Sequence, residues 1–318
     1  MTMGGSSGDL IEVRDLVKRY RKAETNAVDG VSFGVRSGEF FSLLGPNGAG
    51  KTTTISILTT TLTPTSGHVT VDGLNAVNDA AGVRRKVGII FQKPSLDQNL
   101  SGEENVRLHA MLYGLYPYRP FYRAMPRQYR DQVADLAAVL GLEKEIFKPV
   151  KTLSGGMKRK LEIIRGLMHR PKVLFLDEPT AGLDAASRRS LWLYLRDVRA
   201  RFDTTIFLTT HYLEEAEQAD RICILDRGKV VALGTPDQIK AQLLSEWLLL
   251  DAADRSSLRR ELEALGLTFE QEGQFKVPLN GHSAQEVIRS LTTPLTVLKT
   301  HSPSLEDAYL KIVGKEAE

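Results

Sequence analysis

The chain has 318 residues, enough for about two domains at roughly 150 residues per domain. Hydrophobic residues make up 42% and charged residues 25%, which excludes a fibrous or a disordered chain. No run approaches the ~18–20 consecutive apolar residues of a membrane span. The net charge of +3 is too small to predict a nucleic-acid partner.

Residues 1–9 are rich in Gly and Ser and lack the basic and apolar segments of a signal peptide, so we expect a flexible tail. The single cysteine, Cys223, cannot form an internal disulfide, which is typical of a reducing cytoplasm. Because Cys223 lies within an apolar run, we expect a buried strand thiol and not a reactive one.

Residues 10–240 alternate apolar, strand-like runs with helical stretches, a pattern that predicts an α/β domain with a largely parallel sheet. The predicted strands are Glu39–Leu44, Val87–Phe91, Val173–Leu176, Thr205–Thr209, and a hairpin of Ile222–Leu225 with Val230–Leu233. From Gln92 to Leu153 the sequence is mostly helical in character. Residues 93–153 are therefore predicted to form an inserted helical subdomain.

A glycine-rich segment follows the first of these strands and precedes a helical stretch. Its residues fit the P-loop pattern G-x-x-x-x-G-K-[ST]: Gly45, Pro46, Asn47, Gly48, Ala49, Gly50, Lys51 and Thr52, with Thr53 next. The backbone N–H groups of such a loop, and the helix that follows, are suited to phosphate oxygens. We expect Lys51 to bridge the β- and γ-phosphates of ATP and Thr52 to ligate Mg²⁺.

Two carboxylates end the apolar strand that begins at Val173. Asp177 is placed to hold Mg²⁺ through water, as the second acid of a P-loop enzyme, and Glu178 to orient or deprotonate the attacking water. A strand that ends in Asp-Glu is often no more than a solvated strand end. The preceding P-loop favours the catalytic interpretation.

Ser154, Gly155 and Gly156 precede a helical stretch and form a second anion-binding helix start in the same domain. One nucleotide does not need two such sites in one fold, so we infer that this one addresses a nucleotide bound to another subunit. With these motifs, residues 10–235 resemble the ATP-binding domain of ABC-type ATPases. Leu153–Met157 resembles the signature motif of that family.

The resemblance implies roles for several further residues. Tyr20 is similar to the aromatic residue that stacks on adenine, and Gln92 to the glutamine that senses Mg²⁺ and the attacking water. Asp184 resembles the residue that couples two sites across a dimer, and His211 resembles the switch histidine at the γ-phosphate. A head-to-tail homodimer is implied, with each ATP and its Mg²⁺ between one P-loop and Ser154–Gly156 of the other copy.

Residues 241–318 are predicted to form a regulatory or dimerisation domain. Its predicted strands are Trp247–Leu250, Thr268–Gln271, Gln274–Leu279 and Leu295–Lys299, and its first two helices are capped by Asp254 and Ser283. This β-α-β-β-α-β order is the ferredoxin-like arrangement, a small α+β fold. Ser304 opens an additional helix, which can cover the open face of the sheet or cross to a neighbour.

Three features resemble one branch of the family: the continuation Met157–Leu161 of the signature, the C-terminal extension, and the closing motif Pro303–Leu310. They are similar to ATPases of daunorubicin-resistance, nodulation-factor and lipid exporters. This implies efflux of a drug, lipid or saccharide through a separate ABC-2-type permease, at the cytoplasmic face of the inner membrane. An importer ATPase remains an alternative, as does a soluble ABC ATPase that acts on ribosomes or DNA.

The segment Tyr116–Arg130 is longer than the family pattern at this position. Its aromatic residues alternate with arginines. Such residues suit a bilayer interface or a cytoplasmic helix of a partner, because their apolar bodies carry polar or charged tips. An ordinary surface loop with solvated arginines is the alternative. The cargo itself is not predicted, since this kind of ATPase domain does not contact it.

Overall fold

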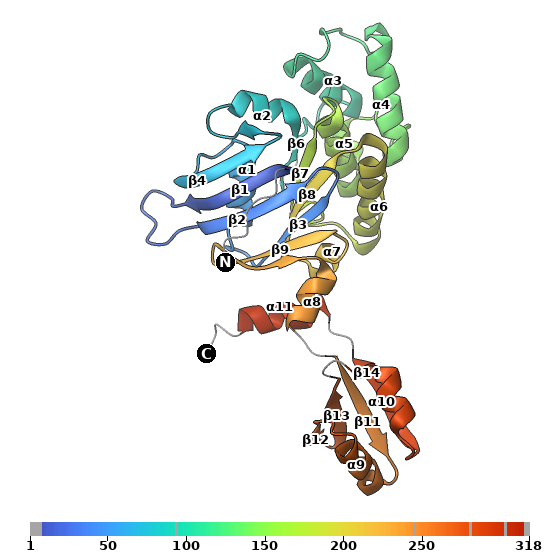
Figure 1. Cartoon of the computed structure of the whole chain (residues 1–318). Coiled ribbons are helices and arrows are strands. Elements are labelled where there is room, and N and C mark those ends of the chain that lie inside the picture. The colour runs from blue at the N-terminus through green and yellow to red at the C-terminus, as the bar shows by residue number, and fades with distance from the viewer. Residues whose placement is uncertain (1–7, 93–94, 244–245, 280–281, 302–303, 315–318) are drawn as a thin grey trace. The chain divides into compact units, whose positions relative to one another are not determined.

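The computed structural model describes residues 8–92, 95–243, 246–279, 282–301 and 304–314 (Figure 1). The chain divides into two compact units, Met1–Leu233 and Gly234–Glu318. Residues 1–7 of the expected tail lie outside the described residues. The tail was predicted too long, because β1 (Asp9–Lys18) already begins at Asp9, which pairs with Arg36. Within the described part of the chain, no helix combines the length and the hydropathy that crossing a membrane requires.

The first unit contains a central sheet of six strands in the order β10-β9-β3-β8-β7-β6. Its strands are β3 (Phe40–Leu44), β6 (Val87–Ile90), β7 (Val173–Asp177), β8 (Thr205–Thr210), β9 (Arg221–Asp226) and β10 (Lys229–Gly234). The pairs β3/β8, β3/β9, β6/β7 and β7/β8 are parallel. The predicted largely parallel sheet is confirmed. Cys223 lies buried in β9, where burial raises the pKa of its thiol to about 12.

A second, antiparallel sheet in this unit was not among the predicted strands. It contains β1, β2 (Val28–Arg36), β4 (Ser66–Val71) and β5 (Leu74–Asn75), in the order β2-β1-β4-β5. The pairing of β1 with β2 is interrupted by register shifts, one of them between Val13 and Leu16. Because a bulge moves the following side chains to the other face, it breaks the two-residue alternation by which strands are recognised.

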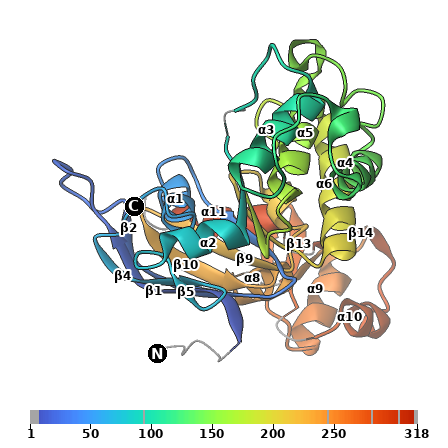
Figure 2. The ribbon, with the colours of Figure 1, turned by 90° about the horizontal axis from the view of Figure 1, so that it is seen from above.

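The central sheet carries a hydrophobic core on each face. Phe41 and Phe175 belong to the core shared with β1, β2, β4 and α1 (Lys51–Leu58), whereas Phe40 and Leu174 belong to the core on the opposite face. That second core is shared with α5 (Gly155–Leu167) and α6 (Ala185–Phe202). Figure 2 shows the antiparallel sheet and these two helices on opposite sides of the first unit. Two short helices, α2 (Ala80–Lys86) and α7 (Leu213–Ala216), complete its periphery.

The inserted segment is helical, as predicted. It contains α3 (Gly102–Leu112), the 3-10 turn η1 (Tyr122–Ala124), α4 (Arg127–Leu140) and the 3-10 turn η2 (Val150–Thr152). A capping box of Ser101 and Glu104 starts α3, and Gly141 ends α4 in the left-handed conformation with φ 62°. Both helices pack against α5, so the helix that follows the signature motif supports the whole subdomain.

The second unit begins with α8 (Pro236–Leu243) and ends with α11 (Leu305–Gly314), which packs against α8. Between them lie β11 (Trp247–Ala252), α9 (Arg255–Ala264), β12 (Glu270–Glu272), β13 (Gln274–Pro278), α10 (Ala284–Ser290) and β14 (Leu295–His301). The sheet order is β12-β13-β11-β14, with antiparallel neighbours. This is the ferredoxin-like arrangement expected from the sequence. Leu258 and Leu262 of α9 and Val287 of α10 pack in the core of this unit.

Candidate active site

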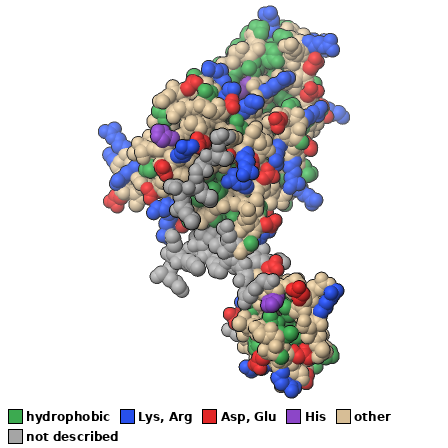
Figure 3. All heavy atoms as spheres, viewed as in Figure 1, with side chains coloured by type: hydrophobic (Ala, Val, Ile, Leu, Met, Phe, Trp, Pro, Cys, Tyr) green, Lys and Arg blue, Asp and Glu red, His purple; other side chains and the backbone are tan. Residues whose placement is uncertain are grey.

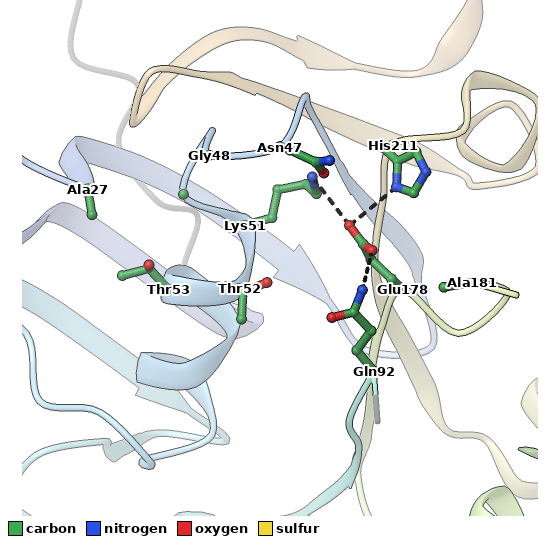
Figure 4. A pocket seen from close by; sticks show the side chains of 11 residues that line it. Ala27, Asn47, Gly48, Lys51, Thr52, Thr53, Gln92, Glu178, Ala181 and His211 are labelled. Atoms are coloured by element: carbon green, nitrogen blue, oxygen red, sulfur yellow. Dashed lines mark hydrogen bonds and ion pairs between the residues drawn. The ribbon is translucent and has the colours of Figure 1, made fainter. Parts of the chain in front are cut away.

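A cavity of about 610 Å³ opens in the first unit, beside the ends of the parallel strands (Figure 4). Its lining residues come from segments distant in the sequence: Ala27, Asn47, Gly48, Gly50, Lys51, Thr52, Thr53, Gln92, Glu178, Ala181 and His211. The P-loop follows β3, Gln92 follows β6, Glu178 follows β7 and His211 follows β8. In parallel sheets, ligands bind beyond the carboxyl ends of the strands, and this cavity lies at that edge.

The glycines of the P-loop are required by close backbone approach. A Cβ atom on Gly45 would collide with the carbonyl of Leu225, and one on Gly50 with the carbonyl of Ala27. Gly48 and Gly50 have φ values of 85° and 101°, which glycine adopts without strain. The loop therefore turns sharply into the first turn of α1, where free backbone N–H groups and the positive end of the helix favour an anion.

Lys51 places a buried cation in this cavity. The residue is 4% exposed, and its Nζ donates to the carbonyls of Gly45 at 2.7 Å and Pro46 at 3.0 Å. Glu178 Oε1 lies 3.6 Å from the same nitrogen. Burial lowers the pKa of Lys51, and the carboxylates of Glu178 and Asp177 act against that shift. A cation held this way suits an anionic ligand such as a phosphate group.

Asp177 and Thr52 form a pair of oxygen donors beside Lys51. Asp177 Oδ1 accepts a hydrogen bond from Thr209 Oγ1 at 2.6 Å and one from Thr52 Oγ1 at 3.4 Å. Burial raises the pKa of Asp177, whereas the hydrogen bond from Thr209 acts to lower it. A carboxylate and a hydroxyl next to a phosphate-binding loop are the donor set that Mg²⁺ prefers, so the residues fit that ion.

Glu178 is the point at which the predicted catalytic residues meet (Figure 4). Gln92 Nε2 donates to its Oε2 at 2.9 Å, and His211 Nδ1 lies 3.3 Å from its Oε1, on the side of Lys51. The backbone of Glu178 is left-handed with φ 43°, and its N–H donates to the carbonyl of Thr209 at 3.2 Å. Such strain in a non-glycine residue is typical of functional sites, and here it aims the carboxylate into the cavity.

Arg159 of α5 is a site residue that the sequence did not indicate. Its buried guanidinium donates to the carbonyls of Phe91 at 2.5 Å, Pro179 at 2.9 Å and Asp177 at 3.2 Å, and it pairs with Glu162 at 3.0 Å. Phe91 directly precedes Gln92, and Asp177 and Pro179 lie on either side of Glu178, so Arg159 holds the backbone next to both predicted residues. The only signal in the sequence that could have revealed Arg159 is its spacing from Glu162: the two charged residues lie three positions apart in a mostly apolar stretch of the helix.

Glu215 of α7 is a second such residue. Its buried carboxylate accepts hydrogen bonds from Thr180 Oγ1 and, at 2.7 Å, from Thr210 Oγ1. Burial raises the pKa of Glu215, and the two threonine hydrogen bonds act to lower it. Because Thr180 follows Glu178 by two residues and Thr210 precedes His211, Glu215 links the segments that carry these two side chains.

The remaining predicted residues are not among those that line the cavity. Tyr20 is about half exposed, with its Oη 3.2 Å from Thr53 Oγ1. Ser154 caps α5 by accepting from the N–H of Met157, and Asp184 caps α6 by accepting from the N–H of Ser187. Gly155 and Gly156 form the first turn of α5. Gly45, Pro46 and Ala49 belong to the P-loop itself, where the carbonyls of Gly45 and Pro46 accept from Lys51 and Ala49 is buried. Ser154 and Asp184 are exposed, which leaves both helix starts open to another molecule.

Comparisons with known proteins identify related ATP-binding proteins. The family profile described as "ABC transporter" matches residues 28–181. The chain is 37% identical to the daunorubicin/doxorubicin resistance ATP-binding protein DrrA of Streptomyces peucetius, over 97% of this chain and 93% of that protein. It is 35% identical to the Nod factor export ATP-binding protein I of Ralstonia nicotianae, over 98% of this chain and 96% of that protein. It is also 38% identical to the probable multidrug ABC transporter ATP-binding protein YbhF of Escherichia coli, but covers 40% of that longer protein.

Solved structures are similar to nearly three quarters of the chain. An ATP-binding subunit of an ABC transporter aligns with a TM-score of 0.62 and 33% identity, over 73% of this chain and 92% of that one. The ATP-binding cassette MJ0796, solved as a dimer in a post-hydrolysis state with ADP and Pi, aligns with a TM-score of 0.62 and 26% identity, over 71% and 98%. The similarity therefore includes a protein whose structure captures the products of ATP hydrolysis.

Proposed function

Because this chain belongs to the ATP-binding proteins of ABC transporters, and so binds and hydrolyses ATP, we propose that it powers an exporter through the residues described above. The observation that best supports this proposal is that Lys51, Gln92 and His211 all contact the carboxylate of Glu178, beside the P-loop. Lys51 belongs to the P-loop, and the other three residues each follow a parallel strand. All four line the same cavity, so the phosphate chain of one bound nucleotide can reach each of them.

In the proposed mechanism, the P-loop N–H groups and Lys51 bind the β- and γ-phosphates of ATP, and Tyr20 stacks on adenine. Thr52, Asp177 and Gln92 would hold Mg²⁺, and the ion would neutralise charge at the phosphates. Glu178 accepts a proton from the water that attacks the γ-phosphorus. His211 and Gln92 contact the γ-phosphate side of the site and report its loss. Each role is assigned to a side chain already held within reach of Glu178 or the P-loop.

ABC ATP-binding proteins dimerise and work with transmembrane permeases, and we propose a head-to-tail homodimer for this chain. The exposed start of α5 at Ser154–Gly156 supplies a second set of free N–H groups, which a nucleotide on the partner P-loop would use. Asp184, at the start of α6, is placed to couple the two sites. A homodimer contains two complete sites, because every motif is intact in this one chain.

We propose a drug, lipid or saccharide exporter because relatives covered over nearly their full length are named for drug resistance and Nod factor export. The finer proposals are an ABC-2-type permease as partner and a location at the cytoplasmic face of the inner membrane. An importer is the second candidate. A neighbouring gene for a six-span permease without a substrate-binding protein supports the exporter, whereas a permease gene beside a binding-protein gene contradicts it.

The test of the mechanism is Glu178→Gln. It removes the base but keeps the shape of the side chain, so ATP binding persists and turnover falls by about 10²–10⁴-fold. Lys51→Ala instead loses ATP binding, because the phosphate charge is no longer balanced. Glu214→Gln, at an exposed position on α7, is the matched control and retains the wild-type rate. Phosphate release and nucleotide binding are measured on each variant, and a wild-type rate for Glu178→Gln would refute the assignment of the base.

A further inference from the structure

The segment between α3 and α4 contains a projecting aromatic loop, Pro117–Phe121, that the proposed mechanism does not use (Figure 1). Both of its flanks are anchored in the helical subdomain. On one side Tyr116 packs edge-on against Tyr129 at 5.4 Å and donates to Gln132 Oε1 at 3.2 Å. On the other side Tyr122 packs against Tyr129 at 6.2 Å. Tyr116 and Tyr122 thus pack against the same buried ring, that of Tyr129, and fix the two ends of the loop.

The anchor itself rests on a buried polar cluster. Tyr129 is fully buried and donates from its Oη to Glu103 Oε1 at 2.9 Å. Arg107 pairs with the same carboxylate at 3.1 Å and also donates from Nη1 to the backbone carbonyl of Arg119, at 2.6 Å. Since Arg119 is the middle residue of the aromatic loop, this hydrogen bond fixes the backbone of the loop between its two flanks.

The side chains of the loop nevertheless point to solvent. Phe121 is 71% exposed and Tyr118 is 53% exposed. The arginines Arg119 and Arg123 are exposed as well, and neither guanidinium has an ion-pair partner among the residues that the structure describes. Arg127, the first residue of α4, forms a solvent-exposed ion pair with Asp131 at 3.4 Å. Figure 3 shows Lys and Arg side chains beside hydrophobic ones over this end of the first unit.

We propose that the aromatic loop binds the surface of an anionic phospholipid bilayer. Tyr and Phe rings that project from a fixed backbone can enter the headgroup region without an ordering cost, and rings with a polar tip favour that depth. Arg119 and Arg123 would pair with lipid phosphates through their planar guanidinium groups. Basic residues next to anionic lipid each add to membrane affinity, and the attraction falls with salt.

The side-chain arrangement favours a bilayer over a segment of a partner protein. A partner helix binds in a groove lined by apolar anchors. Here the exposed aromatics Tyr118 and Phe121 stand on a loop. Tyr116 and Tyr122, whose rings could line a groove, are each packed against Tyr129, and Tyr122 also packs against Phe147. Contact with a bilayer surface needs no groove and can be made by the projecting side chains alone.

The test uses the purified full-length chain and vesicles, without permease or ATP. We expect it to sediment with vesicles of phosphatidylcholine mixed with phosphatidylglycerol, and at least tenfold more weakly with phosphatidylcholine alone. Replacing Tyr118 and Phe121 by Ser, or Arg119 and Arg123 by Ser, should lower binding to the mixed vesicles at least tenfold. Only the arginine pair should remove the salt dependence. ATP hydrolysis should stay at the wild-type rate, because neither pair contacts the cavity.

Matched controls remove exposed groups elsewhere on the first unit. Leu193→Ser on α6 removes an exposed apolar side chain, and Arg85→Ser with Arg201→Ser removes two exposed arginines. Both controls should bind vesicles like the wild type. If the wild type does not bind the mixed vesicles, or if both loop variants bind them normally, the proposal is overturned. Loop variants that lose the permease but not the vesicles would assign the loop to the partner protein instead. The proposed function stands or falls separately, on the Glu178 variants.

Discussion

At the scale of single residues, the site is held by buried groups that contact its own residues and not the ligand. Thr209 is one example: its hydroxyl donates to Asp177, and its carbonyl accepts from the strained N–H of Glu178. One threonine thereby fixes both acids at the end of β7. Glu215 does the same for the segments on either side, through Thr180 and Thr210. The geometry at Glu178 therefore depends on buried groups behind it.

The first prediction at this scale concerns Glu215. Glu215→Ala leaves the hydroxyls of Thr180 and Thr210 buried without their acceptor, which costs about 1–3 kcal/mol in unfolding free energy. It should also lower kcat by about tenfold or more, because the segment carrying His211 is no longer held, with a smaller change in KM. Glu215→Gln keeps an acceptor and should recover most of kcat. Chemical denaturation and steady-state ATPase kinetics are the measurements.

Glu214→Ala is the control for that experiment, since Glu214 is exposed on the same short helix. It should change neither stability nor kinetics. If Glu215→Ala loses stability but keeps kcat, Glu215 acts on the fold alone and does not position the site.

The sequence predicted the residues whose role follows from a local pattern. The P-loop, the Asp177–Glu178 pair and the start of α5 each lie within a few residues of a strand end or helix start. Arg159 and Glu215 were missed because their partners are distant: the carbonyl of Phe91 lies 68 positions from Arg159, and the hydroxyl of Thr180 lies 35 from Glu215. A hydrogen bond of that range leaves no trace in spacing or periodicity.

At the scale of elements, α5 connects the surface proposed to contact a second copy with the catalytic residues of its own chain. Its first turn, at Ser154, is exposed, and its second turn carries Arg159, which holds the backbone beside Gln92 and Glu178. A rigid helix thus joins the surface offered to a second copy with the site of this copy. The antiparallel sheet was the element least accessible to prediction, because the bulges in β1 disturb its alternation.

The prediction for α5 is that Ser154→Arg blocks ATP-driven dimerisation. The larger side chain would occupy the space in which the γ-phosphate of the partner must lie, whereas the P-loop of the same chain is unaffected. Nucleotide binding to the monomer should stay near the wild-type value. Light scattering with ATP, in a Glu178→Gln background that prevents turnover, measures the dimer.

Asp79→Arg is the matched control, because Asp79 caps α2 of the first unit just as Ser154 caps α5. It loses a helix cap and gains an arginine, but outside the proposed interface between P-loop and signature. A dimer that still forms with Ser154→Arg would argue against the head-to-tail arrangement.

At the scale of the whole molecule, the two units have separate hydrophobic cores. The site residues of the proposed mechanism all precede Gly234, so we expect hydrolysis to proceed without the second unit. The order of strands and helices of that unit was predictable, because short strands alternate with capped helices. The contact of α11 with α8 was not, since these helices lie far apart in the sequence and their apolar faces do not specify a partner.

The last prediction concerns the second unit as a clamp. If it holds two copies together when the ATP sites open, it raises the effective concentration for closing them again. A chain that ends at Gly234, the observed boundary, should still bind and hydrolyse ATP. Its specific activity should fall at least tenfold further on dilution than that of the full chain, because closing becomes bimolecular. A second variant that ends at His301 lacks only α11 and separates the role of the helix from that of the ferredoxin-like sheet. Equal oligomeric state and equal concentration dependence in all three proteins would reject the clamp and assign the second unit to docking another protein.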